Sequence, residues 1–167
     1  MLFLGVLVVG TAVASLVGRQ HSTWRDHFRR GFGAAMIVAG LSHLARPEPF
    51  LQHVPGWMPW PDATVAVTGI VEVALGLLMY WPQRLREHVG LTLVAYLVAV
   101  FPANVYVAIE GIDVQGQPGG LYSWLRLPLQ ALFVFLAWWS TRTPAGEPVP
   151  EGNGPVTANR PLQRTSH

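Results

Sequence analysis

Five apolar runs follow one another along the chain, and polar segments rich in arginine, acidic residues or proline separate them. A helix needs about 20 residues to cross the hydrocarbon core of a membrane, which is about 30 Å thick. The runs do not alternate with a period of two, and they are too long for barrel strands. The pattern therefore predicts an all-α membrane protein with spans at about 2–18, 27–46, 63–81, 89–109 and 121–140.

The first run has a second interpretation, because Ala12-Val13-Ala14 has the small residues of a signal-peptidase site. A signal peptide carries a positively charged stretch ahead of its apolar segment, and none precedes this run. Its removal would also make the second run enter the membrane from the wrong side. We therefore expect the first helix to be retained.

Composition agrees with a membrane protein and excludes several other classes. Hydrophobic residues make up 51% of the 167 residues and charged residues 12%, which is about half the usual charged fraction of a soluble domain. Cysteine is absent, which excludes a disulfide scaffold and thiolate metal sites. Segment 143–167 is rich in proline and glycine and poor in apolar residues, so we expect a disordered tail after a helical domain at 1–142.

The arginines predict how the helices are oriented. Of the eleven basic residues, nine lie in alternate connections on one side of the membrane, and positively charged loops are typically cytoplasmic. The N-terminus is therefore expected outside the cytoplasm and the tail inside. Because the arginines lie in short loops rather than on one face, the net charge of +2 does not indicate nucleic-acid binding. The nine are Arg19, Arg25, Arg29, Arg30, Arg84, Arg86, Arg142, Arg160 and Arg164.

Two further features refine this arrangement. Arg29 and Arg30 are expected to extend from the second span toward the cytoplasmic surface. All seven tryptophans lie near predicted membrane boundaries, a depth that indole rings prefer.

Segment 46–62 carries five prolines, which disfavour a regular helix, together with several apolar residues. We expect it in the outer interface, and two alternatives stay open: it folds over the mouth of the bundle, or it anchors in lipid.

Five polar side chains fall inside the predicted spans, where each needs a partner or a function. At 1.5 Å per residue, Glu72 lies about 15 Å below the outer boundary, Asn104 and Arg126 about 9 Å, and His43 about 5 Å. Gln130 follows Arg126 by one helical turn. All five lie in the outer half of the bundle, although they come from four different spans.

We predict that these residues form one buried polar cluster. In it, Glu72 pairs with Arg126, while His43, Asn104 and Gln130 complete the hydrogen bonds. The cluster is either a site that handles a ligand or protons, or a set of contacts that fixes the helix register. One histidine and one carboxylate do not make a metal site, so no metal is expected.

Small residues indicate which helix faces approach closely, and prolines indicate where spans lose regular hydrogen bonds. Pro102 and Pro128 each remove one helical hydrogen bond and free a carbonyl for another partner. The small residues expected at close helix contacts are Gly33, Gly40, Gly69 and Gly76.

Five short motifs occur in order along the chain: GLSH at 40–43, VPGWMPWP at 54–61, GIVE at 69–72, FPANVY at 101–106 and WLRLPLQ at 124–130. Together they resemble the DoxX-like family of small bacterial membrane proteins over roughly His43 to Trp139. The resemblance implies a four-helix transmembrane bundle, here with one additional N-terminal helix.

The resemblance also implies a function, because some DoxX-like proteins are subunits of quinone-linked membrane oxidoreductases. It suggests that His43, Glu72, Asn104, Arg126 and Gln130 form a pocket for a quinone or similar head group. The expected partners are membrane lipids, quinone and other subunits of a redox complex in the bacterial inner membrane. No cofactor motif is visible, so catalysis by this chain alone is not expected.

Two alternatives remain beside that interpretation. One is a small proton-coupled transporter or lipid-handling protein in which Glu72 carries the proton. The other is a structural scaffold in which the polar cluster only holds the helices together.

Overall fold

The computed structural model describes residues 2–17, 23–80, 85–114 and 120–142. Within them the regular secondary structure is entirely α-helical, as predicted. Helices α4, α5 and α6 are each long and apolar enough to cross a membrane, and α1 is a shorter apolar helix. The predicted tail at 143–167 and the boundary residue Trp81 lie outside the described residues. The helices are α1 (Leu2–Val17), α2 (Trp24–Ala45), α3 (Glu48–Leu51), α4 (Pro61–Leu78), α5 (Arg86–Glu110) and α6 (Leu121–Thr141).

The start of α2 is fixed by a capping box, which places it three residues before the predicted span. The Thr23 hydroxyl accepts a hydrogen bond from the Asp26 backbone N–H at 3.3 Å, and the Asp26 carboxylate accepts one from the Thr23 N–H at 3.1 Å. These two bonds satisfy backbone donors that the helix itself leaves free. α4 begins at Pro61, where the missing N–H of proline has no helical partner to lose.

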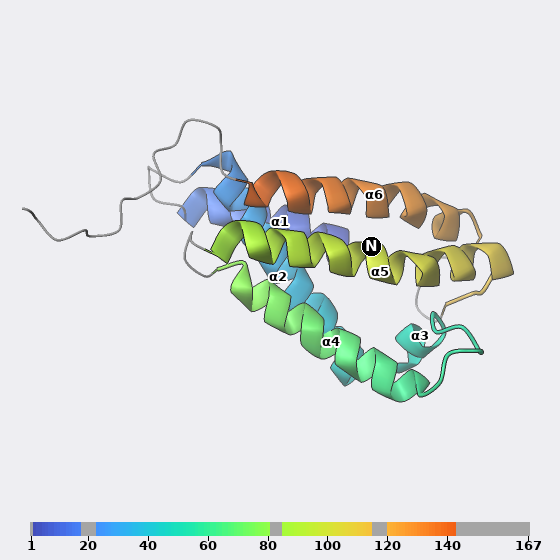
Figure 1. Cartoon of the computed structure of the whole chain (residues 1–167). Helices are drawn as coiled ribbons and strands as arrows, with labels where there is room; N and C mark the ends of the chain where they lie inside the picture. Colours follow the sequence, from blue (N-terminus) through green and yellow to red (C-terminus); the bar gives the residue numbers. More distant parts are fainter. Residues whose placement is uncertain (1, 18–22, 81–84, 115–119, 143–167) are drawn as a thin grey trace, which may run out of the picture.

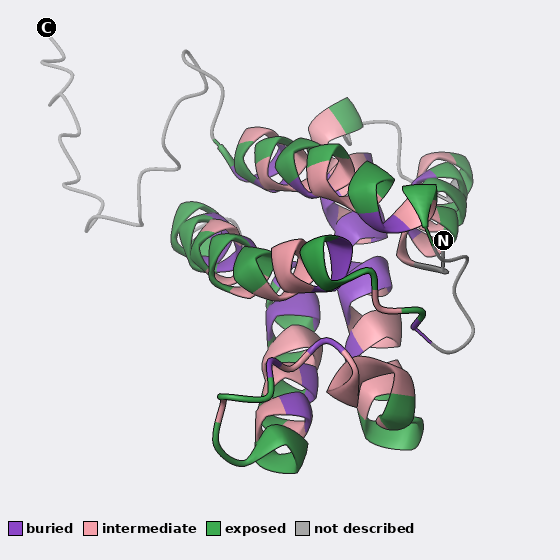
Figure 2. Ribbon diagram, turned by 90° about the vertical axis from the view of Figure 1, so that its right-hand side faces the viewer, coloured by how far each residue is buried: buried purple, intermediate pink, exposed green. Residues whose placement is uncertain are grey.

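α2 lies at the centre of the helix packing. It contacts α1, α4 and α6, whereas α5 packs mainly on α6. Figure 1 shows α5 and α6 side by side, with α4 diverging from α5 toward α3. Buried positions gather where the helices face one another, and exposed positions lie on the outer faces (Figure 2).

Glycines bring the backbones of α2 and α4 together at two levels, as predicted. A Cβ atom on Gly76 would lie 2.7 Å from the Gly33 carbonyl oxygen, and one on Gly69 would lie 3.0 Å from the Gly40 carbonyl oxygen. Any larger side chain at these positions would push the two helices apart.

Two arginines close the end of the bundle where α2 begins, and one of them corrects a prediction. Arg29 does not extend to the surface: it is only 9% exposed, and its guanidinium donates to the Met79 carbonyl beyond α4. Arg86 donates to the Ser140 carbonyl of α6 at 2.8 Å. The last carbonyls of a helix lack helical partners and carry partial negative charge, so both contacts satisfy a helix end. Asp26 lies between the two guanidinium groups, at 3.6 Å from Arg29 and 3.3 Å from Arg86.

The glycine contact gives a direct test of this packing. Substituting Gly76→Val should lower the free energy of unfolding by about 1–3 kcal/mol, because the added side chain overpacks the α2–α4 contact. The control is Ala74→Val, which adds bulk to an exposed position of the same helix. Thermal unfolding of both variants in detergent measures the effect, and equal midpoints would contradict the close α2–α4 contact.

Candidate functional site

A cavity of about 1160 Å³ lies where α4 and α5 diverge. Residues of α2, α4, α5 and α6 form its walls, and segment 46–60, which includes α3, contributes to its outer end. Most of the lining side chains are apolar. The five polar residues singled out in the sequence all line this one cavity: His43, Glu72, Asn104, Arg126 and Gln130.

The Glu72 carboxylate lies between two other helices. The Tyr96 hydroxyl of α5 donates to Glu72 Oε1 at 2.8 Å. On the other side, Oε2 is 3.1 Å from His43 Nδ1 of α2. That ring nitrogen is also 2.9 Å from the Ala39 carbonyl oxygen, and Oε2 accepts no hydrogen bond from the residues that the structure describes. A buried carboxylate oxygen that accepts no hydrogen bond is costly in an apolar interior, so a proton or a ligand donor on Oε2 would stabilise the site.

The predicted pair between Glu72 and Arg126 is wrong. Among the ion pairs of the described residues none joins these two side chains, and Glu72 is instead close to His43. Arg126 Nη1 lies 2.7 Å from Nε2 of His53. The two residues were placed correctly at one cavity, but depth along each helix did not determine which side chains meet.

His53 and Tyr96 are the residues of this site that the sequence did not reveal, and His53 lies outside the long helices. It is 9% exposed, and its Nδ1 lies 2.9 Å from the Pro49 carbonyl oxygen. Donation from Nδ1–H to that carbonyl leaves Nε2 free to accept the Arg126 hydrogen bond, so the ring is neutral. Burial and the neighbouring guanidinium of Arg126 lower the pKa of His53 to about 4.

Segment 46–60 folds over the cavity on one side and faces outward on the other. The ring of Phe50 stacks on His43 with 3.7 Å between centroids, and His53 meets Arg126 as described. Trp57 and Trp60 are 77% and 79% exposed. The segment therefore folds over the cavity, the first of the two alternatives, and its two tryptophans stay exposed. A four-residue helix, α3, also forms here despite the prolines, because proline is tolerated in the first turn of a helix.

Gln130 and Asn104 occupy different environments within the cavity. Gln130 is buried and its amide donates to the Leu97 carbonyl oxygen of α5 at 2.9 Å, which ties α6 to α5. The next carbonyl along α5, that of Val98, accepts no helical hydrogen bond from residue 102, because proline has no N–H to donate. Asn104 is only half-buried and lines the cavity about two turns beyond Leu97 along α5.

The lining combines strong hydrogen-bond donors, one carboxylate and two imidazoles with an apolar wall. Such a mixture suits an amphipathic ligand whose polar atoms need orientation. The described residues include no group of three or more His, Asp or Glu side chains that could hold a metal ion.

Residues 32–141 match the family model described as Domain of unknown function (DUF8561). The chain belongs to this family. The DUF8561 region runs from Phe32 within α2 to Thr141 at the end of α6, so it contains the cavity's five predicted residues, whereas α1 precedes it. No curated protein and no solved structure matches the chain.

Acid should release segment 46–60 from the cavity. A free imidazole has a pKa of about 6.5, so a released His53 binds a proton that the closed form excludes down to about pH 4. Above pH 6.5 the equilibrium between the open and closed forms of the segment therefore favours the closed form to its full extent. Below that pH, the ratio of open to closed form should rise about tenfold per pH unit as the pH falls toward 4. Hydrogen exchange of the segment's amides at pH 7 and pH 5, corrected for intrinsic rates, measures this change.

The control for this measurement is His53→Gln, whose amide oxygen still accepts a hydrogen bond from Arg126 but does not titrate. It should lose the pH dependence, while His43 remains present in both proteins. Equal responses of the wild type and the variant to acid would contradict the role of His53.

Proposed function

We propose that this chain is a DoxX-like integral protein of the bacterial inner membrane and an accessory subunit of a quinone-linked oxidoreductase. In this proposal the cavity at Glu72 holds the quinone head group, and other subunits of the complex supply the redox cofactors. The chain itself binds and orients the ligand.

The observation that carries the proposal is the arrangement of the polar side chains around one cavity of about 1160 Å³. Side chains that only fixed helix register would pack against one another and leave little space. Here the carboxylate of Glu72 and the guanidinium of Arg126 each bond to a different partner, and both line the same cavity. Separate polar groups around an apolar space favour a ligand site over a scaffold.

The residues present fit a quinone head group. Its two carbonyl oxygens accept hydrogen bonds, and the cavity is lined by Arg126, whose guanidinium carries five N–H donors. The apolar lining suits the ring and the isoprenoid tail. When bound, a quinone supplies two-electron chemistry that side chains cannot. His43 Nδ1 and Glu72 Oε2, 3.1 Å apart, are close enough to pass a proton.

The membrane topology in this proposal has five spans. A four-helix bundle of α2, α4, α5 and α6 carries the cavity, and α1 is the additional N-terminal span. The family region supports this division because it excludes α1. The arginines support a cytoplasmic position for the end at which α2 begins and α6 ends, so the cavity opens toward the outer leaflet.

A second candidate function is proton-coupled transport or lipid handling. The position of Glu72 beside His43 favours it, because a carboxylate that gains and loses a proton within the membrane is a typical relay group. This function predicts proton flux into dye-loaded vesicles that Glu72→Gln abolishes, with no requirement for quinone.

The quinone proposal is tested by the binding of a short-chain ubiquinone analogue to the full chain in nanodiscs, measured by calorimetry. Substituting Glu72→Gln keeps an acceptor for the Tyr96 hydroxyl but removes the charge. We expect binding at least about tenfold weaker, because the variant loses the charged contact that holds His43 in place beside the cavity.

The matched control is Glu110→Gln, which changes an exposed carboxylate at the end of α5. It should bind like the wild type. Equal affinities of the wild type and Glu72→Gln, or no binding above that of empty nanodiscs, would overturn the quinone proposal.

A further inference from the structure

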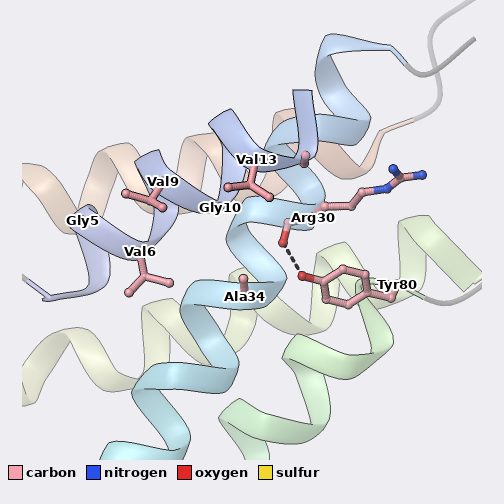
Figure 3. A pocket seen from close by; sticks show the side chains of 9 residues that line it. Gly5, Val6, Val9, Gly10, Val13, Arg30, Ala34 and Tyr80 are labelled. Atoms are coloured by element: carbon pink, nitrogen blue, oxygen red, sulfur yellow. Dashed lines mark hydrogen bonds between the residues drawn. The ribbon is translucent and has the colours of Figure 1, made fainter. Parts of the chain in front are cut away.

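A second cavity lies nearer the start of α2 than the Glu72 site does. It is a groove of about 670 Å³ between α1 and the end of α4, with α2 as its floor (Figure 3). Val9 and Val13 of α1 line it and are 63% and 52% exposed. At Gly5, an added Cβ would have no atom within 4 Å. The groove is therefore open, and its wall along α1 is apolar.

One charged side chain lines this groove. Arg30 lies at the end of the groove near the start of α2, and its guanidinium extends away from the apolar wall (Figure 3). No ion pair joins Arg30 to another described residue. The Tyr80 hydroxyl donates to the Arg30 backbone carbonyl at 2.8 Å, which holds α2 and the end of α4 together here. The side chain of Arg30 is not needed for that contact.

The surroundings of Arg30 are also positively charged. Arg25 and Arg29 lie within the same two turns of α2, and Arg86 packs against Arg29's partner Asp26. Asp26 is shared by two guanidinium groups, so it cannot neutralise this end of the bundle. An anion at Arg30 would lie in a favourable field.

We infer that this groove binds an anionic phospholipid, with the phosphate at the Arg30 guanidinium and an acyl chain along α1. From Gly5 to Ala14 the apolar wall extends about 14 Å, at 1.5 Å per residue. Arginine binds phosphate through a planar fork of N–H donors. Basic pockets between membrane helices are typical sites for anionic head groups. The inference does not depend on what the Glu72 cavity holds.

The charge at one end distinguishes a lipid from a second copy of this chain. An apolar helix from a partner would fill the groove but would not need an arginine at its end. A phospholipid matches both features, because its tail is apolar and its phosphate is anionic.

The test is native mass spectrometry of the full chain with phosphatidylglycerol or phosphatidylcholine that carry identical acyl chains. The wild type should retain phosphatidylglycerol preferentially. In Arg30→Gln its affinity should fall about fivefold, the effect of one basic residue near a membrane surface, and the preference should disappear. The control Arg142→Gln removes an exposed arginine of the same end that lies over Trp138, outside the groove, and should bind like the wild type.

A second variant, Gly5→Leu, places a bulky side chain in the groove at a position where the Cβ meets no neighbouring atom. It should reduce retention of both lipids. Equal retention of the two lipids by the wild type, or an equal loss in Arg30→Gln and Arg142→Gln, would overturn the inference. A change in oligomeric state in Gly5→Leu with unchanged lipid retention would also overturn it, because a second copy would then occupy the groove.

Discussion

The backbones of α2 and α4 meet at two pairs of glycines, and the contact between His43 and Glu72 depends on this close approach. At one level Gly69 leaves room for the Cβ atom of His43, which an alanine there would approach to 2.8 Å. That spacing brings the His43 ring within 3.1 Å of the Glu72 carboxylate. At the other level Gly33 and Gly76 hold the helices together near the end where Arg29 closes α4. The contact between His43 and Glu72 therefore depends on the glycine at position 69, which has no side chain to hold the two helices apart.

The second helix pair explains why the space beside Glu72 is not filled. α5 packs on α6 and only sparsely on α4, so the two helix pairs diverge toward α3. Tyr96 spans this gap with its hydrogen bond to Glu72, while Gln130 joins α6 to the adjacent residue of α5, Leu97. Segment 46–60 then covers the outer end through His53 and Phe50. Each polar side chain of the cavity is held by its own partner, and the wall around it is apolar. The polar groups therefore need to move little when a ligand binds, and they can orient it.

The apolar runs predicted the long helices, because their hydrophobicity is continuous and their length matches a membrane. The depth of each polar residue along its helix also placed all five at one cavity. Depth says nothing about which way a side chain faces, so the partner of Glu72 was predicted wrongly. His53 was missed because a proline-rich segment has no periodicity that marks a buried face. The start of α2 could have been found, since Thr23 followed by Asp26 is a capping-box signal.

The central claim is that the polar residues around Glu72 bind an amphipathic ligand rather than only one another. Mass spectrometry of the lipids that co-purify from native membranes tests it without assuming the ligand. Wild type, Glu72→Gln and Glu110→Gln would be purified side by side and shown to be equally folded. We expect a quinone to be enriched in the wild type and in Glu110→Gln and to be lost in Glu72→Gln. Identical lipid profiles from all three proteins would contradict the central claim and favour a purely structural role for the cluster.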